Sequence, residues 1–231
     1  MNSYSIGVLA IAGISTFLLA SLQDHRKRRI HFLIFLPFMV IINTVYILLS
    51  KNIDLIILGD IMWGIMFLDP EKWIFPLPVA LLFGIGLIVF YHSIDAAINW
   101  TIIGLFAFLG VRERLFGIGD IKGMIASAIS LSPLYVTYGV YYRIQMPSNI
   151  LFVINLGITS SIALAWAMIY TKKITGKIGY YVKYQGDIDQ IRFREMERNG
   201  SKYVSYKIPF MEFILGAYII TIISLVAGFP L

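Results

Sequence analysis

The chain has 231 residues, of which 58 % are hydrophobic and only 14 % are charged, and it contains no cysteine. A soluble domain carries about 25 % charged residues, so this sequence has too little polar surface for a water-soluble globule. The lack of cysteine excludes disulfides, thiolate zinc sites and cysteine nucleophiles. The net charge of +6 does not indicate nucleic-acid binding, because the basic residues are confined to the segments between apolar runs.

Eight apolar runs follow one another along the chain, and about 20 residues are needed to cross a bilayer. They predict an all-α polytopic membrane protein, built as a bundle of about eight transmembrane helices. The runs cover Tyr4–Leu22, Phe32–Ser50, Ile53–Leu68, Ile74–Tyr91, Ala96–Val111, Ile121–Tyr142, Ile150–Tyr170 and Ile208–Gly228. The first run has no basic stretch before it and a basic cluster after it, which favours a retained helix over a signal peptide.

The distribution of lysine and arginine predicts the orientation of these helices. With the N-terminus outside, 17 of the 19 basic residues fall in inside segments, and only Lys51 and Arg143 lie outside. Cytoplasmic loops of membrane proteins carry such an excess of positive charge. We therefore expect a protein of the cytoplasmic membrane with both termini outside.

One sizeable polar segment, residues 171–207, is predicted on the cytoplasmic side. Its YYVKY and KYVSY stretches alternate like strands, and the DIDQIRFREMERNG stretch between them suggests a short helix opened by Asp187 and closed by Asn199-Gly200. We expect a small α/β or hairpin appendage, and a solvated basic loop on anionic lipid is the alternative. The predicted organisation is a membrane catalytic part over residues 1–170, this appendage, and a final membrane helix within 208–231.

Two polar clusters could carry chemistry. SLQDHRKRRI, Ser21 to Ile30, ends the first predicted helix, and GIGDIKG, Gly117 to Gly123, opens the sixth. Each places an aspartate within about one turn of the same membrane face. Asp24 and Asp120 can therefore be neighbours although they are 96 positions apart.

Two adjacent carboxylates do not ionise together easily, so one is expected to hold a proton and form an acid–base pair around one water. Gly117 and Gly119 are expected to let the loop turn sharply and approach a substrate. Asp120 is expected near a helix N-terminus, with Lys122 close by, and both favour its ionised form. Asp24 is expected at a helix C-terminus, where only Arg26 and its basic neighbours favour ionisation. The predicted assignment makes Asp120 the more acidic member.

These residues carry a family resemblance. Ser21-x-Gln23-Asp24-x-Arg26-x-Arg28-x-Ile30 and Gly117-x-Gly119-Asp120-x-Lys122 resemble the paired motifs of archaeal preflagellin and type IV prepilin peptidases, the GxGD class of membrane aspartic proteases. Lys207-Ile208-Pro209-Phe210 is similar to a Pro-Phe element that opens the last helix in that family. Both motifs occur in the family's order, each at a predicted cytoplasmic helix end.

The resemblance implies a reaction and its partners. The family removes a short basic leader, the class III signal peptide, from pilin-like or flagellin-like precursors at the cytoplasmic membrane face. No metal or organic cofactor is expected, and the partners are such precursors and membrane lipids rather than nucleic acid. Bacterial relatives also N-methylate their products with a cysteine-bearing domain, so this chain is expected to be a peptidase alone. Glu113, Asp187, Asp189, Glu195 and Glu197 are candidates to attract the basic leader.

The sequence departs from the family in the spacing of its aspartates, which is wider and includes two more predicted spans. Asp60 stands 60 positions before Asp120, nearer the family's usual spacing, but it lies mid-span without an arginine-rich sequel. A carboxylate in mid-membrane is a functional candidate by default. A structural hydrogen bond from Asp60 to Asn43 or Asn99 is the reading we favour.

Three other functions remain open at this point. A presenilin-like intramembrane protease would have its aspartates near mid-membrane. A proton- or ion-coupled transporter would use Asp60, Asp95 and Asp120, and it predicts an inverted repeat that the sequence does not display. A non-enzymatic assembly scaffold would tolerate loss of both Asp24 and Asp120.

Overall fold

The computed structural model describes residues 3–27, 30–49, 53–68, 75–111, 117–132, 134–138, 144–184, 186–190, 192–198 and 201–227. Within these ranges the chain forms eight α-helices and two small antiparallel sheets. The helices are α1 (Ser3–Lys27), α2 (Leu36–Leu49), α3 (Ile53–Ile65), α4 (Pro76–Phe90), α5 (Ile94–Gly110), α6 (Ile118–Leu131), α7 (Ser148–Thr175) and α8 (Phe210–Ala227), with a 3-10 turn over Phe32–Ile34. Each of the eight apolar runs overlaps with one of these helices, so the mostly helical fold is confirmed.

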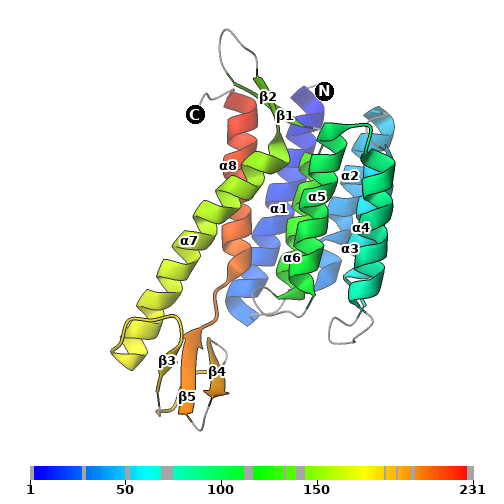
Figure 1. Ribbon diagram of the computed structural model, residues 1–231. Helices are drawn as coiled ribbons and strands as arrows, with labels where there is room; N and C mark the ends of the chain where they lie inside the picture. The colour runs from blue at the N-terminus through cyan, green and yellow to red at the C-terminus, as the bar shows by residue number, and fades with distance from the viewer. Residues whose placement is uncertain are drawn as a thin grey trace.

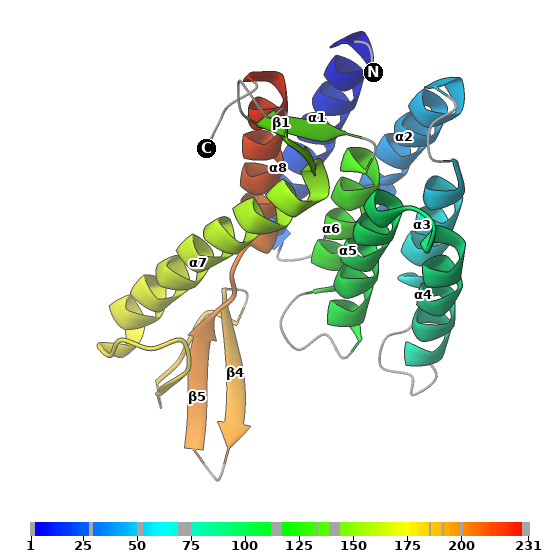
Figure 2. The same cartoon turned by 45° about the horizontal axis from the view of Figure 1, so that its top comes forward.

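The helices stand side by side, except for the long α7, which is inclined to the others (Figures 1 and 2). α7 packs along α8, α8 packs along α1, and α4, α5 and α6 follow one another in contact. Both ends of the described chain lie at one end of the bundle, and a three-stranded sheet lies at the other (Figure 1). The last turn of α1 and the first turns of α6 and α8 all lie at the end of the bundle that is nearer to the three-stranded sheet, called the sheet end below (Figure 1).

α6 is the central helix of this bundle. Every residue from Ile121 to Leu131 is buried, and α6 contacts α1, α2, α3, α5, α7 and α8. Its sequence is apolar or small on all sides, which is the pattern of a helix enclosed by others. The start of α6, where Asp120 lies, is therefore held from several directions.

Side chains from three other helices fix the far end of α6. Tyr46 of α2 donates its hydroxyl to the carbonyl of Ser130. Asn99 Nδ2 of α5 donates to Ser132 O at 2.8 Å, and Asn149 Nδ2 of α7 donates to Ala128 O at 2.9 Å. The last carbonyls of a helix have no intrahelical partner, so these bonds satisfy them and anchor α6 along its axis.

The predicted sixth span, Ile121–Tyr142, is wrong beyond residue 132. α6 ends at Leu131, and the chain continues as a hairpin of β1 (Tyr135–Tyr138) and β2 (Ile144–Pro147), with Tyr135 opposite Pro147. The sequence change at Pro133 explains the difference, since proline lacks the backbone N–H that an extended helix would need. The β-branched and aromatic residues that follow favour a strand.

The appendage is a sheet with strand order β3-β5-β4, formed by β3 (Val182–Lys183), β4 (Phe193–Arg198) and β5 (Ser201–Tyr206). α7 runs past the predicted boundary at residue 170 and ends at Thr175, followed by Gly176 at φ +71°, a conformation that favours glycine. Phe193, Val204 and Tyr206 pack on Ala167 of α7. The sheet is thus joined to the bundle through α7.

The helix expected between Asp187 and Gly200 is wrong. Residues 193–198 form strand β4, and residues 186–190 form neither helix nor strand. Arg198 is paired with Ser201 across a two-residue connection, and Asn-Gly is the strongest sequence signal for such a hairpin. The predicted helix stop at Asn199-Gly200, which lies outside the described residues, is better understood as this hairpin signal.

Two of the described helices are long and apolar enough to cross a membrane, judged by length and composition: Ile6–Lys27 and Ser148–Thr175. Four shorter helical stretches are also apolar, and they cover Leu36–Leu48, Pro76–Phe90, Ile94–Gly110 and Phe210–Val226. Helices of the shorter length also occur in the cores of soluble proteins.

Candidate active site

Asp24 lies in the last turns of α1, where its side chain is buried against the start of α8. Its Oδ2 accepts a hydrogen bond from the backbone N–H of Met211 at 3.3 Å. α8 begins at Phe210, directly after Pro209, as expected for a Pro-Phe element that opens the last helix. Proline is common where a helix begins, because the first N–H groups have no intrahelical partner. Asp24 supplies the acceptor for one of these free amides.

A second polar contact joins the same two helix ends. His25 Nδ1 and Glu212 Oε1 are 2.7 Å apart, and Glu212 lies in the first turn of α8. Glu212 was not among the residues predicted from the sequence, although an acidic residue in the first turn of a helix is a recognisable signal. Together the two contacts hold the end of α1 against the start of α8.

Asp120 lies in the first turn of the central helix α6. Its Oδ2 accepts a hydrogen bond from the backbone N–H of Gly117, the N-cap residue, at 3.2 Å, and the backbone N–H of Asp120 donates to the Gly117 carbonyl at 3.0 Å. This arrangement fixes the carboxylate at the helix entrance. The predicted position of Asp120 near a helix N-terminus is confirmed.

The sharp turn predicted for the two glycines does not depend on a left-handed backbone at either of them, and their approach to a substrate stays a prediction. Gly117 has φ −70° and ψ 154°, an extended conformation open to any residue, so no sharp turn depends on it. A Cβ on Gly119 would lie 3.2 Å from both Cβ and Cδ1 of Ile30. Gly119 therefore permits the close approach of the segment that follows α1, and this approach keeps the two aspartate-bearing segments together.

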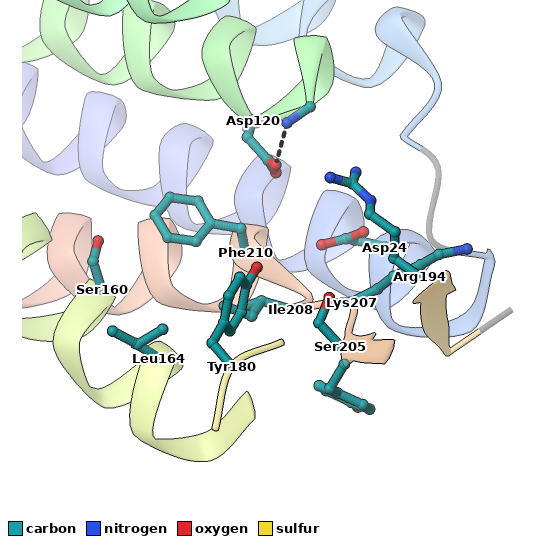
Figure 3. Close-up of a pocket in the computed structure, with 12 residues that line it drawn as sticks. Asp24, Asp120, Ser160, Leu164, Tyr180, Arg194, Ser205, Lys207, Ile208 and Phe210 are labelled. Atoms are coloured by element: carbon teal, nitrogen blue, oxygen red, sulfur yellow. Dashed lines mark hydrogen bonds between the residues drawn. The ribbon is translucent and has the colours of Figure 1, made fainter. Parts of the chain in front are cut away.

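Both aspartates line one cavity of about 440 Å³ at the sheet end of the bundle (Figure 3). The lining comes from α1, the start of α6, the middle of α7, the sheet region and the start of α8. Its residues are Asp24, Gly117, Asp120, Ser160, Leu164, Tyr180, Arg194, Ser205, Tyr206, Lys207, Ile208 and Phe210. A cavity of this size accommodates a short stretch of peptide or a small molecule.

The carboxyl group of Asp120 is held in its protonated form near neutral pH. Burial and the negative charge of Asp24 raise the pKa of Asp120 to about 8, although the hydrogen bond from Gly117 opposes the rise. The lowered pKa that the helix N-terminus was expected to give Asp120 is therefore not found, because burial outweighs the helix N-terminus.

The two basic residues that were expected to act on the dyad lie elsewhere. Lys122 Nζ is 3.8 Å from the centre of the Phe67 ring, and Lys122 is not among the described lining residues. A cation above an aromatic face is attracted by the ring electrons. Arg26 is exposed at the end of α1 and does not line the described cavity either.

Asp60 is remote from the cavity. Asn43 Nδ2 donates to Asp60 Oδ2 at 2.7 Å, so the expected structural hydrogen bond is present. A Cβ on the neighbouring Gly59 would lie 2.9 Å from Ile129, which is nine positions beyond Asp120 on α6. At 1.5 Å per residue this separates Asp60 from Asp120 by about 14 Å along the helix axis.

The other residues of the transporter hypothesis are not brought together. Asp95 lies in the first turn of α5, whereas Asp120 faces the last turn of that helix, since Gly110 lies close to Ile121. Asp95 is therefore near the opposite end of the bundle from Asp120. The structure places Asp24 and Asp120 on one cavity and leaves Asp60 and Asp95 away from it.

Among the acidic residues expected to attract a basic leader, the described ones do not line the cavity. Asp189 faces Arg192 at 3.7 Å, and Glu195 pairs with Lys202 at 2.6 Å. Asp187 and Glu197 also do not line the described cavity, and Glu113 lies outside the described residues.

Sequence reasoning missed the residues that the sheet region contributes to the cavity. Tyr180, Arg194, Ser205 and Lys207 all line it. If residues 193–198 (FREMER) had been predicted as a strand, Arg194 would have been placed on the face opposite to the buried Phe193. Because this stretch was predicted as a helix, the position of Arg194 was not recognised.

No group of three or more His, Asp or Glu side chains among the described residues is arranged to hold a metal ion. Comparison with family models, with curated proteins and with solved structures gives no match for this chain. A protonated carboxylic acid beside a second carboxylate can polarise a carbonyl and activate a water at once.

Proposed function

We propose that the chain is a membrane aspartic peptidase that removes short basic leaders from pilin-like or flagellin-like precursors at the cytoplasmic face of the membrane. The observation that carries this proposal is the convergence of Asp24 and Asp120 on one cavity, although they are 96 positions apart. The two motifs that resemble the prepilin and preflagellin peptidases contain these two residues.

The protonation of the pair supports hydrolysis. Asp120 carries a proton near neutral pH, because burial and Asp24 raise its pKa to about 8. Asp120 donates a hydrogen bond to the carbonyl oxygen of the scissile peptide bond, and Asp24 accepts a proton from the attacking water. The water oxygen bonds to the carbonyl carbon, the C–N bond then breaks, and a proton moves to the leaving nitrogen. The products are a new carboxyl terminus and a new amine.

The outer surfaces of the helices support a membrane location. Leu48, Ile88 and Val226, on three different helices, are between 73 % and 77 % exposed, and many other large apolar side chains are exposed on the same bundle. Soluble monomers rarely expose large contiguous apolar patches. A bilayer around the bundle removes these side chains from water.

The distribution of charge supports the orientation. In the described part of the chain, every lysine and arginine lies at the sheet end, on the last turns of α1 and α7, the first turns of α6, the sheet region or the link to α8. Positive charge accumulates on the cytoplasmic side of membrane proteins. The residues that line the cavity lie at this end of the bundle, where a precursor presents its leader before its apolar helix.

The test is cleavage of a tagged pilin or flagellin precursor in membranes that contain the full chain. Wild type is compared with Asp24→Asn, Asp120→Asn and Asp60→Asn at matched expression. We expect cleavage by wild type and Asp60→Asn, and none by the other two variants. A wild type that leaves the precursor intact contradicts the peptidase proposal, and it would favour the transporter or scaffold alternatives.

The position of the cut distinguishes the proposed function from that of an intramembrane protease of the presenilin type. Our proposal expects the cut on the leader side of the precursor's apolar helix, because Asp24 and Asp120 line the cavity from the ends of their helices rather than from the middle. Mass measurement of the released fragments decides between the two. Fragments that end inside the apolar helix would contradict the proposed substrate class.

A further inference from the structure

Two polar side chains from the sheet region enter the cavity that contains the carboxylates. Tyr180 precedes β3 and Arg194 lies on β4, and both line the cavity with Asp24 and Asp120. In Figure 3 the Arg194 guanidinium projects toward the two carboxylates, and the Tyr180 hydroxyl points into the cavity from below. The cavity thus has an acidic wall from the bundle and a hydrogen-bond-donating wall from the sheet.

We propose that Arg194 and Tyr180 are catalytic residues that bind the scissile carbonyl oxygen and stabilise the negative charge that develops on it. This inference rests on the proposed peptidase activity. It assigns a catalytic role to the appendage. The sequence predicted only that this segment is a small fold or a loop on lipid.

The sheet aims Arg194 at the cavity. Phe193 is buried against α7, and successive side chains of a strand point to opposite faces, so Arg194 faces away from α7. The neighbouring charged side chains have other partners, since Arg192 faces Asp189 and Lys202 pairs with Glu195. Arginine offers five N–H donors in a fixed plane, and it remains charged at any working pH.

Tyr180 is suited to donate a hydrogen bond in the same cavity. Its ring is partly buried against the cluster that joins the sheet to α7. Burial raises the pKa of Tyr180, with a smaller rise from Tyr181 and an opposing effect of Arg194. The phenol therefore keeps its proton at neutral pH and is available as a donor.

The chemistry of hydrolysis needs such donors. When the water oxygen bonds to the carbonyl carbon, the electron pair of the C=O bond moves onto the oxygen, and the proton lost by the water passes to Asp24. Asp120 supplies one hydrogen bond to that oxygen, and Arg194 and Tyr180 supply the others. A donor aimed at a developing oxyanion is worth about a 100- to 1000-fold factor in kcat.

The positive charge of Arg194 also orients the substrate. A basic leader is repelled by the Arg194 guanidinium, and the carboxylates of Glu195 and Glu197 lie on the opposite face of β4 by strand alternation. The leader therefore leaves the cavity away from β4.

The experiment measures kcat and KM of the purified full chain on a tagged precursor with a basic leader. The variants are Arg194→Gln, Arg194→Lys and Tyr180→Phe. Two neighbours outside the cavity lining provide matched controls: Arg192→Gln removes a guanidinium that faces Asp189, and Tyr181→Phe removes the hydroxyl of an exposed ring. Thermal unfolding of each variant is measured in the same detergent.

We expect Arg194→Gln to lower kcat about 100-fold and Tyr180→Phe about 10-fold, with KM nearly unchanged, because the charge on the oxygen exists only in the transition state. Arg194→Lys should recover part of the loss, and both controls should remain within about twofold of wild type. An unchanged kcat in Arg194→Gln, or a loss equal to that of Arg192→Gln, overturns the inference. Failure of the proposed function is distinct from this result, because it appears as a wild type that does not cleave.

Discussion

Asp24 Oδ2 accepts a hydrogen bond from the backbone N–H of Met211 at 3.3 Å, so a carboxylate at the end of α1 caps the start of α8. The two residues are 187 positions apart. Only residues 207–209 separate β5 from α8, and Tyr206 N donates to Thr171 Oγ1 of α7 at 3.1 Å. The position of Asp24 is therefore linked, through the first turn of α8, to the strand that carries part of the cavity wall.

This capping bond separates the chemical role of Asp24 from its structural role. Asp24→Asn keeps a side-chain oxygen that can accept from Met211, whereas Asp24→Ala removes the acceptor. We expect both variants to lose cleavage by more than about 1000-fold, because a neutral side chain cannot take a proton from water. Only Asp24→Ala should also lower stability, by about 0.5–2 kcal/mol, the usual cost of losing a helix cap.

Cleavage of a tagged precursor and thermal unfolding of the same preparations check this prediction. Glu212→Gln is a suitable control, since it alters the contact with His25 at the same helix junction without touching the dyad. Retained cleavage in Asp24→Asn would show that Asp24 caps α8 and does no chemistry.

The convergence of Asp24 and Asp120 could be predicted because it depends on parity and on local motifs. Each aspartate lies near a helix end, and an even number of helix passages returns the chain to the same face. The contribution of Arg194 could not be predicted in this way. Its direction depends on Phe193 packing against Ala167, a contact between a strand and a helix that local sequence does not encode.

The protonated state of Asp120 predicts an alkaline limit to the reaction. Its pKa is raised to about 8, chiefly by burial and by Asp24, so Asp120 loses its proton as the pH rises through that value. Cleavage needs the proton on Asp120, and we expect kcat/KM to fall about tenfold for each pH unit above about 8, because this pKa is that of the enzyme without substrate. Measurement of kcat/KM between about pH 5 and pH 10 checks this limit. A flat profile across this range would contradict it.

The same residue predicts how stability changes with pH. In the unfolded chain Asp120 has its ordinary pKa near 4. Between about pH 4 and 8 the folded protein therefore binds more protons at this site, and the contribution of Asp120 to stability falls as the pH rises. Asp120→Asn should remove this dependence, so its melting temperature should exceed that of wild type at about pH 8 and approach it at about pH 5. Equal differences at both values would mean that Asp120 does not titrate in this interval.

The two glycines of the second motif should respond differently to alanine. Gly117 has an extended backbone, and an added Cβ would meet only Asp120 Oδ2 at 3.5 Å, an ordinary contact, so Gly117→Ala should fold normally. At Gly119 an added Cβ would lie 3.2 Å from Ile30, so Gly119→Ala should cost about 1–3 kcal/mol. Thermal unfolding of both variants checks the difference.

Ile30→Ala provides the internal control for Gly119. If the cost arises from contact with Ile30, the double variant Gly119→Ala with Ile30→Ala should be more stable than the sum of the two single changes predicts. Additive effects would place the strain elsewhere in the loop. The packing of Ile30 against Gly119 is a tertiary contact, which the local sequence does not reveal. The sequence therefore suggested a sharp glycine turn rather than this contact.

The last prediction concerns Asp60, which lies at the family's usual spacing and yet has a structural contact. Asn43 Nδ2 donates to Asp60 Oδ2 at 2.7 Å, and the second oxygen of each side chain is buried without a hydrogen-bond partner among the described residues. Asp60→Asn supplies the missing donor, since its amide can donate to Asn43 Oδ1 while its oxygen still accepts from Asn43 Nδ2. We expect Asp60→Asn to be at least as stable as wild type and to cleave the precursor normally.

Asp60→Leu is the opposite case, because it leaves Asn43 buried without a partner. It should lower stability by about 1–3 kcal/mol, and the paired change Asn43→Leu with Asp60→Leu should recover most of this loss. Thermal unfolding and precursor cleavage, measured on the same membranes, check both statements. If Asp60→Asn abolishes cleavage and Asp24→Asn retains it, Asp60 rather than Asp24 is the partner of Asp120. The 60-residue spacing would then be a better guide to the pair than the motif around Asp24.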